Sequence, residues 1–141
     1  MIRKPRNPHD ALFKAAEKAG HAFERRKGAQ LRQNARTAQQ QKNWAVAESL
    51  WRQALQDEPG ERASVIGLAQ VLVYNGKFDE AAELAAEIVA KWPADENGPT
   101  VLARLAEERG DTARALAQWR RVLELQPTRG QALIRLGRLM I

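Results

Sequence analysis

The chain has 141 residues, 44% of them hydrophobic, and a net charge of +6, which is enough apolar material for the continuous core of one ordinary domain. It contains no cysteine, so disulfides, thiolate metal sites and cysteine nucleophiles are excluded together, and this composition suits a cytoplasmic location. No apolar run approaches the ~20 residues needed to cross a bilayer, and none follows the basic start. We therefore expect neither a membrane span nor a secretory signal.

The positive charge is concentrated in the N-terminal segment. Residues 1–42 carry 11 basic and three acidic side chains, whereas the remaining 99 residues carry 12 basic and 14 acidic ones. Within residues 7–27 several apolar side chains have helical spacing after the capping residue Asp10: Leu12, Ala15, Ala16, Ala19 and Phe23. We interpret residues 1–27 as a basic segment with a helix that covers the exposed end of the next unit. The alternative is a basic tail with transient helix.

The rest of the chain repeats with a period of 34 residues. Three sets of residues keep this interval: Pro59, Pro93 and Pro127; Ala47, Ala81 and Ala115; and Ala35, Ala69, Ala103 and Gly137. A fixed period of this length indicates stacked copies of one small unit, each of which buries its apolar face against its neighbours. With the proline near the end of each unit, the units are 28–61, 62–95 and 96–129, with a partial fourth at 130–141.

Each unit has the pattern of two helices. In the second unit, apolar side chains lie at i, i+3, i+4 and i+7 from Val65 to Leu72, and Gly76 ends this helix because glycine accepts the left-handed conformation. A second helix follows and closes before Pro93. The third unit repeats this plan around Gly110.

The four tryptophans fall into two groups. Trp51 and Trp119 occupy equivalent places inside the apolar stripe of their helices, so we expect them in the core. Trp44 and Trp92 lie at helix edges, where we expect partial exposure. The chain then begins a seventh helix with Leu133, Leu136 and Met140, which have no following helix to cover them fully. Two interpretations stay open: the chain is a fragment of a longer protein, or this helix forms a homo-oligomer.

These residues resemble the tetratricopeptide repeat family, whose unit is a 34-residue helix-turn-helix with a small residue early in each helix and a closing proline. The resemblance covers about residues 28–141, with Asn34 in place of an apolar residue and Lys42 in place of a glycine. It implies an all-α, right-handed superhelical array of about three repeats plus flanking helices. The first helices of such an array line a concave groove. In bacterial proteins, arrays of this kind often precede transferase domains.

By this resemblance, Arg36, Arg104 and Arg138 share one place in their units and should form a row in the groove. Such a row suits a carboxylate-bearing peptide, because arginine presents a planar fork to a carboxylate. The alternative is that these arginines are solvated, or paired with Glu107 and Glu108. The predicted peptide-binding surface consists of Arg32, Arg36, Gln70, Tyr74, Arg104 and Arg138.

By the same resemblance, Gln39, Asn97 and Thr100 also occupy places that face the groove. Some family members clamp the C-terminal carboxylates of heat-shock chaperones with basic residues and an asparagine. Here Gly67 stands where that asparagine should be, and Thr100 replaces a basic residue, so the sequence departs from that clamp.

The sequence contains few side chains of the kinds that carry out catalysis. The only histidines are His9 and His21, and there is no glycine-rich phosphate loop, zinc motif or nucleophile elbow. We expect no catalysis, no cofactor and no metal, and we predict a non-catalytic scaffold that binds a protein or peptide. One alternative is a regulatory or adaptor module of a larger bacterial protein such as a transferase. Another is a nucleic-acid or anionic-surface adaptor that uses the basic run at residues 25–27, although no tryptophan alternates with basic residues as a base-stacking platform would.

Overall fold

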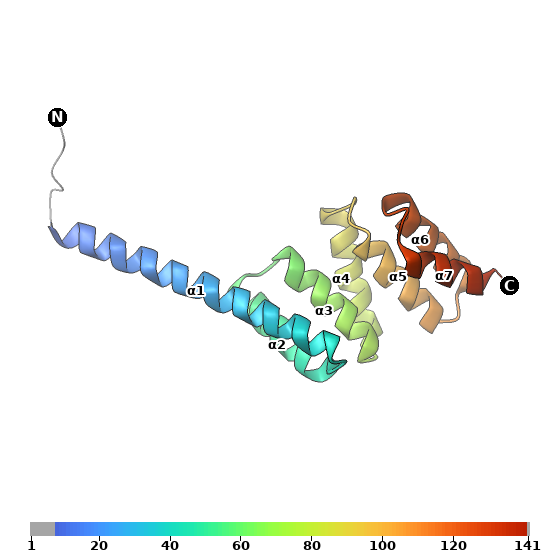
Figure 1. Cartoon of the computed structure of the whole chain (residues 1–141), viewed down its shortest axis with the longest axis horizontal. Coiled ribbons are helices and arrows are strands. Elements are labelled where there is room, and N and C mark those ends of the chain that lie inside the picture. Colours follow the sequence, from blue (N-terminus) through green and yellow to red (C-terminus); the bar gives the residue numbers. More distant parts are fainter. Residues whose placement is uncertain (1–7, 141) are drawn as a thin grey trace, which may run out of the picture.

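A computed structural model of the chain describes residues 8–140, and within that range it contains seven helices and no strand. The helices follow one another in chain order along an elongated molecule (Figure 1). Each helix packs against the next, and the first helices also contact one another, α1 with α3 and α3 with α5. The bounds are α1 (Pro8–Gln40), α2 (Trp44–Asp57), α3 (Arg62–Tyr74), α4 (Phe78–Lys91), α5 (Asn97–Glu108), α6 (Thr112–Leu125) and α7 (Gly130–Leu139). This is the all-α array of helix pairs that the 34-residue period predicts.

Turns with a specific backbone geometry separate the two helices of each unit. Gly76 and Gly110 have φ angles of +74° and +71°, the left-handed region that glycine enters without steric cost. Lys42, at the equivalent place after α1, has a φ of 58° and is the one non-glycine residue with positive φ among residues 8–140. Asn43 and Asp111 then cap α2 and α6, because each side chain accepts a hydrogen bond from a backbone N–H in the first turn.

Small residues form the core at the helix crossings. Helix axes approach to about 8 Å only where small side chains meet. Both alanine series that follow the 34-residue period have 0% exposed surface, in the first helices (Ala35, Ala69 and Ala103) and in the second helices (Ala47, Ala81 and Ala115). The burial of all six confirms the expectation on which the repeat interpretation rests.

The tryptophans lie as expected. Trp51 and Trp119 are buried, with 2% and 0% of their surface exposed, whereas Trp44 and Trp92 are half-buried. The Trp51 ring packs directly on the backbone of α3 at Gly67. A Cβ atom at this glycine would lie 2.2 Å from Trp51 Cε2. The contact therefore requires a residue without a side chain.

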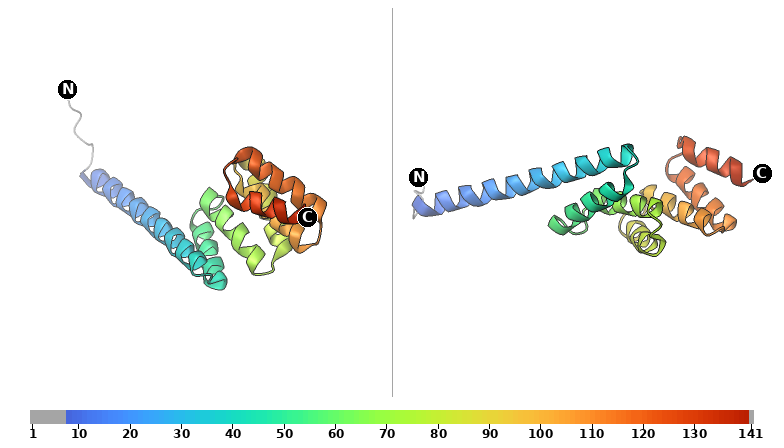
Figure 2. Two further views of the ribbon diagram at one scale, coloured as in Figure 1. Left: turned by 45° about the vertical axis from the view of Figure 1, so that its right-hand side comes forward. Right: turned by 90° about the horizontal axis from the view of Figure 1, so that it is seen from below.

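The N-terminal helix differs from the sequence-based expectation. A separate helix over residues 7–27 was expected to cover the end of the first unit, but α1 runs without a break from Pro8 to Gln40. Its second half packs on α2, and its first half extends past the array (Figure 1 and Figure 2). No proline or left-handed residue interrupts residues 9–40, so the two predicted helices form one. Residues 1–7 of the predicted N-terminal segment lie outside the described residues.

The last helix, α7, is partly covered. Leu136 is 9% exposed and packs with Ala132 against α6, so the preceding helix already covers most of it. Leu133, Ile134 and Met140 are 55%, 59% and 67% exposed. A homo-oligomer through this face stays a prediction. None of the helices within residues 8–140 is both long and apolar enough to cross a membrane.

Candidate peptide-binding groove

A hollow of about 480 Å³ lies where α1, α3 and α5 come together. Most of its lining side chains are polar and come from the first helix of each unit, with the edge of one buried tryptophan from α2. The principal lining residues are Arg36, Gln39, Trp51, Arg62, Gln70 and Asn97. The hollow thus spans three successive units, which matches the groove that the sequence predicts.

A chain of hydrogen bonds crosses the floor of this hollow. The indole Nε1 of Trp51 donates to Gln39 Oε1 at 2.7 Å, and Gln39 Nε2 donates to Gln70 Oε1 at 3.4 Å. Gln70 Nε2 in turn donates to Asn97 Oδ1 at 3.1 Å. Side chains from α2, α1, α3 and α5 are therefore joined in one polar line.

An ion pair completes this line at α5. Asn97 Nδ2 donates to Asp95 Oδ1 at 2.8 Å, and the guanidinium of Arg62 donates to Asp95 Oδ2. Burial alone would raise the pKa of Asp95, but the hydrogen bonds from Arg62 and from Asn97 outweigh it and lower this pKa. Arg62 also lies over the ring of Trp92, with Cζ 5.8 Å from the centroid. This arginine is therefore held by both an acid and an aromatic ring.

A second hollow, of about 300 Å³, lies farther along α3 and α5. Tyr74 forms its centre. The ring of Tyr74 stacks on Trp44 with 4.0 Å between centroids, and Arg104 lies on it with Cζ at 5.6 Å. Arg104 Nη1 also donates to the Tyr74 hydroxyl at 2.9 Å. At its edge Arg135 Nη1 donates to Glu107 Oε1 at 3.4 Å.

Arg104 still has hydrogen-bonding capacity. Its Nε is buried and has no hydrogen-bond partner in the part of the chain that the structure describes. Among the side chains that the structure describes, no carboxylate lies at ion-pair distance from Arg104 or from Arg36. Arg36 instead lies over the Trp51 ring, with Cζ at 5.9 Å. Both guanidinium groups are therefore positioned by aromatic rings and leave their charge available.

The predicted surface residues do not all lie together. Arg36 and Gln70 line the first hollow, and Tyr74 and Arg104 line the second. Arg32 lies elsewhere, in a hollow against the end of α2, where Nη1 is 3.6 Å from Glu58 Oε2. Two further predicted residues lie outside both hollows. Arg138 is exposed on α7. Thr100 is 2% exposed, and its hydroxyl donates a hydrogen bond to the Glu96 carbonyl.

Two groove side chains were not predicted from the sequence. Arg62 was not assigned to the groove, and Trp51 was expected only in the core. Trp44 lines neither hollow but stacks on Tyr74, which lines the second. A signal for Trp51 existed, because a buried indole N–H needs an acceptor and Gln39 lies twelve residues before it. Arg62 precedes the first apolar stripe of its unit, so helical periodicity alone does not mark it.

A sequence profile described as Tetratricopeptide repeat matches residues 32–96 and 100–140. The chain belongs to the tetratricopeptide repeat family. The matched residues include every lining residue of both hollows except Asn97, so both hollows are built by tetratricopeptide repeats of the right-handed superhelical kind. Comparison with curated protein sequences finds no match.

Solved structures similar to this tetratricopeptide repeat chain share its fold at low sequence identity. The Arabidopsis OM64 TPR domain is 16% identical with a TM-score of 0.73, covering 82% of this chain and 96% of that one. The first TPR of Spaghetti (RPAP3), bound to the HSP90 peptide SRMEEVD, is 17% identical with a TM-score of 0.70, covering 82% and 91%. The Thermobaculum terrenum O-GlcNAc transferase is 21% identical with a TM-score of 0.76, covering 83% of this chain and 22% of the transferase.

Proposed function

We propose that this chain is a non-catalytic scaffold whose groove binds an extended peptide segment that carries a carboxylate. The observation that supports the proposal is the position of the Arg36 and Arg104 guanidinium groups. Each guanidinium lies over an aromatic ring and has no ion-pair partner within residues 8–140. An arginine held in this way presents its planar fork at little further loss of side-chain freedom.

The amides between these arginines fit the same ligand. Gln39, Gln70 and Asn97 present donors and acceptors that suit the backbone of an extended segment. Tyr74 adds an aromatic surface that is half exposed. A peptide that runs from Arg36 to Arg104 would therefore meet a cation at each end and neutral polar groups between.

The proposed binding mode differs from the carboxylate clamp, in which an asparagine and basic residues bind the C-terminal carboxylates of a peptide. The Trp51 ring occupies the space next to Gly67, so this position cannot hold the asparagine of such a clamp. The known ligand of the RPAP3 domain, the HSP90 peptide, serves as a comparison in the test.

The test is a binding assay on an array of peptides with free or amidated C-termini and with acidic, neutral or basic side chains. Tryptophan fluorescence, to which Trp51 in the groove contributes, provides a second readout. We expect acidic or free-carboxylate peptides to bind, and Arg36→Glu/Arg104→Glu to weaken binding by more than about tenfold, or 1.4 kcal/mol.

The matched control is Arg114→Glu/Arg120→Glu, which makes the same change of net charge on the exposed surface of α6. It should bind like the wild type. Equal loss in both double variants would show a long-range charge effect and would contradict a specific groove, as would binding of neutral, amidated peptides alone.

A further inference from the structure

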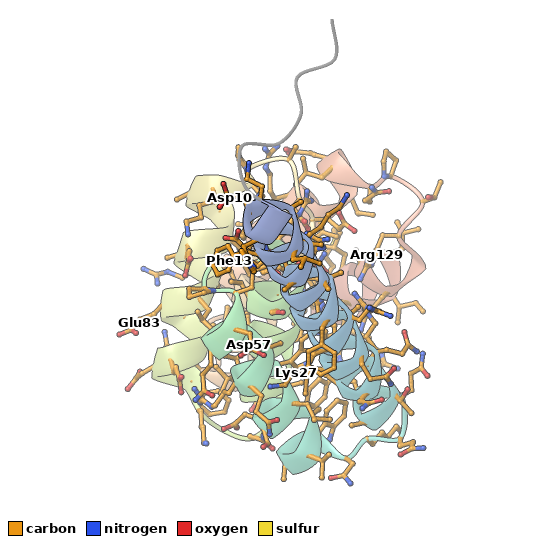
Figure 3. All side chains as sticks on the ribbon, turned by 90° about the vertical axis from the view of Figure 1, so that its left-hand side faces the viewer. Asp10, Phe13, Lys27, Asp57, Glu83 and Arg129 are labelled. Atoms are coloured by element: carbon orange, nitrogen blue, oxygen red, sulfur yellow. The ribbon has the colours of Figure 1, made fainter. Side chains whose placement is uncertain are left out.

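The first half of α1 carries an apolar surface that no helix within residues 8–140 covers. Leu12, Phe13 and Phe23 are 69%, 71% and 65% exposed. This part of α1 extends past the array, with Asp10 and Phe13 near its outer end (Figure 1 and Figure 3). An isolated helix gains little stability from its own hydrogen bonds, so a stretch of this kind is normally stabilised by packing on an apolar face.

The apolar residues form a seam with the spacing of a coiled coil. Leu12, Ala16, Ala19 and Phe23 are separated by four, three and four residues, the spacing of alternating a and d positions. With 3.6 residues per turn, this seam falls on the side of α1 turned away from Gly28, which is buried where α1 meets α2. The packing of α1 on its own array therefore leaves the seam accessible.

We propose that this seam pairs with the same seam of a second copy of the chain, with the two α1 helices antiparallel. The twofold axis would pass between residues 17 and 18. Leu12 of one copy then lies opposite Phe23 of the other, and Ala16 lies opposite Ala19. Large residues stand at the ends of the seam and small ones in the middle, so in this antiparallel order each large residue lies opposite a large one and each alanine opposite an alanine. The central alanines allow the helix axes to approach to about 8 Å.

The local shape of α1 fits this arrangement. A hollow of about 450 Å³, bordered by Phe23, Arg26 and Lys27, continues the seam toward the array. In the antiparallel order this hollow receives Leu12 of the second copy. Phe13 flanks the seam on the side where the second copy presents Gly20, and no atom lies within 4 Å of a Cβ built at that glycine. Leu12 and Phe13 of one copy therefore each meet a space on the other copy.

The charges favour the same orientation. The outer half of this stretch, residues 8–17, carries Asp10, Lys14 and Glu17, and the basic run at residues 25–27 lies in its inner half. An antiparallel pair sets the acidic half of one helix beside the basic run of the other, whereas a parallel pair would set the two basic runs together. The four phenylalanines alone offer on the order of 150 Å² each, so the pair approaches the ~1,000 Å² of a specific interface.

The test uses the full chain and measures its mass by light scattering over a wide range of concentration. We expect the wild type to reach twice the 15.8 kDa of one chain as the concentration rises. Ala16→Glu sets two carboxylates in the seam and should raise the dissociation constant by more than about tenfold. The matched control, Ala11→Glu, makes the same change on an exposed face of α1 away from the seam and should dimerise like the wild type.

The antiparallel orientation of the two α1 helices is tested by cysteine cross-linking. The chain has no cysteine of its own, so only the introduced cysteines can form a disulfide. Leu12→Cys protein mixed with Phe23→Cys protein should form a mixed disulfide. Either protein alone should not, since its two cysteines would lie ~16 Å apart along the helices, beyond the ~7 Å Cα separation of a disulfide.

Two outcomes would overturn the proposal. One is a wild-type chain that stays monomeric at every concentration, including one that binds vesicles of anionic lipid in place of a second copy. The other is a dimer that Ala16→Glu and Ala11→Glu affect equally. Neither outcome bears on the peptide groove, which is lined by the C-terminal end of α1 together with α3 and α5 and is tested with other variants.

Discussion

The indole ring of Trp51 on α2 fills the space that a side chain at Gly67 on α3 would occupy. A Cβ atom there would lie 2.2, 2.5 and 2.7 Å from three atoms of the ring, and the ring is buried and cannot move aside freely. We predict that Gly67→Ala lowers the free energy of unfolding by about 1–3 kcal/mol, even though alanine favours a helix. Chemical denaturation followed by tryptophan fluorescence measures this change.

Gly137→Ala is the matched control. Gly137 also lies within a helix, and no atom lies within 4 Å of a Cβ built on it. This substitution should raise stability by about 0.5–1 kcal/mol, because alanine loses less backbone freedom on folding. A Gly67→Ala protein as stable as Gly137→Ala would mean that Trp51 does not pack on α3 as described.

Lys42 offers a stabilising substitution. Its φ of 58° is in the left-handed region, which costs a non-glycine residue about 1–2 kcal/mol, while Gly76 and Gly110 occupy the equivalent turns. Lys42→Gly should therefore raise the free energy of unfolding by about 0.5–1 kcal/mol after the greater freedom of glycine in the unfolded chain is subtracted. Lys42→Ala, which removes the charge and keeps the strain, should give no such gain. Thermal unfolding of the two variants and the wild type tests this prediction.

Acid should weaken the array through Glu48. This carboxylate is 9% exposed and accepts hydrogen bonds from Lys77, Asn75 and Arg52 at 2.7, 2.9 and 3.1 Å. Burial by itself would raise the pKa of Glu48, but these three donors outweigh it and lower the pKa to about 2. Because the folded pKa is depressed, the contribution of Glu48 to stability is complete above about pH 4.5 and is lost as the pH falls toward 2.

The size of this contribution is at most about 3 kcal/mol. We predict that Glu48→Gln lowers stability at neutral pH and flattens the fall in stability between about pH 4.5 and 2. Glu83→Gln, on the exposed side of α4, is the control and should leave the pH dependence unchanged (Figure 3). The measurement is urea unfolding at a series of pH values. A Glu48→Gln protein with the wild-type pH profile would contradict the prediction.

Trp51 and Trp119 occupy equivalent places but differ in hydrogen bonding. Trp51 Nε1 donates to Gln39, whereas Trp119 Nε1 is buried without a partner in the part of the chain that the structure describes. Phenylalanine at either position removes the same volume. Trp51→Phe should therefore cost about 1–2 kcal/mol more than Trp119→Phe, because only the latter removes an unsatisfied donor. Equal costs, measured by denaturation, would argue against this difference.

The repeat period predicted the fold, because the two series of fully buried alanines at the helix crossings return at the same interval. Ala69 and Ala103 are fully buried for the same geometric reason, so one unit predicts the next. Residues 8–27 lie outside the period, and their pattern specifies a helix but not where it ends. Whether that helix folds back or continues depends on the absence of a breaker before residue 28, which a count of apolar positions does not register.

The site was predicted less well. The family pattern placed Arg36, Gln70, Tyr74 and Arg104 at the two hollows, but it gave no information on which cations meet an acid. Arg32 lies near Glu58 because α2 ends beside it, and this depends on tertiary packing. Contacts of that kind join residues far apart in sequence, so they follow from the fold and not from local spacing.

The hydrogen bonds from Trp51 through Gln39 and Gln70 to Asn97 join three successive units along the first hollow. In a solenoid, each unit is held only by its neighbours, so these amides help to set the curvature of the spiral. A ligand that hydrogen-bonds to Gln70 in place of Asn97 would remove one of the links between two units. In that case, binding in the proposed groove and the curvature of the array would be coupled.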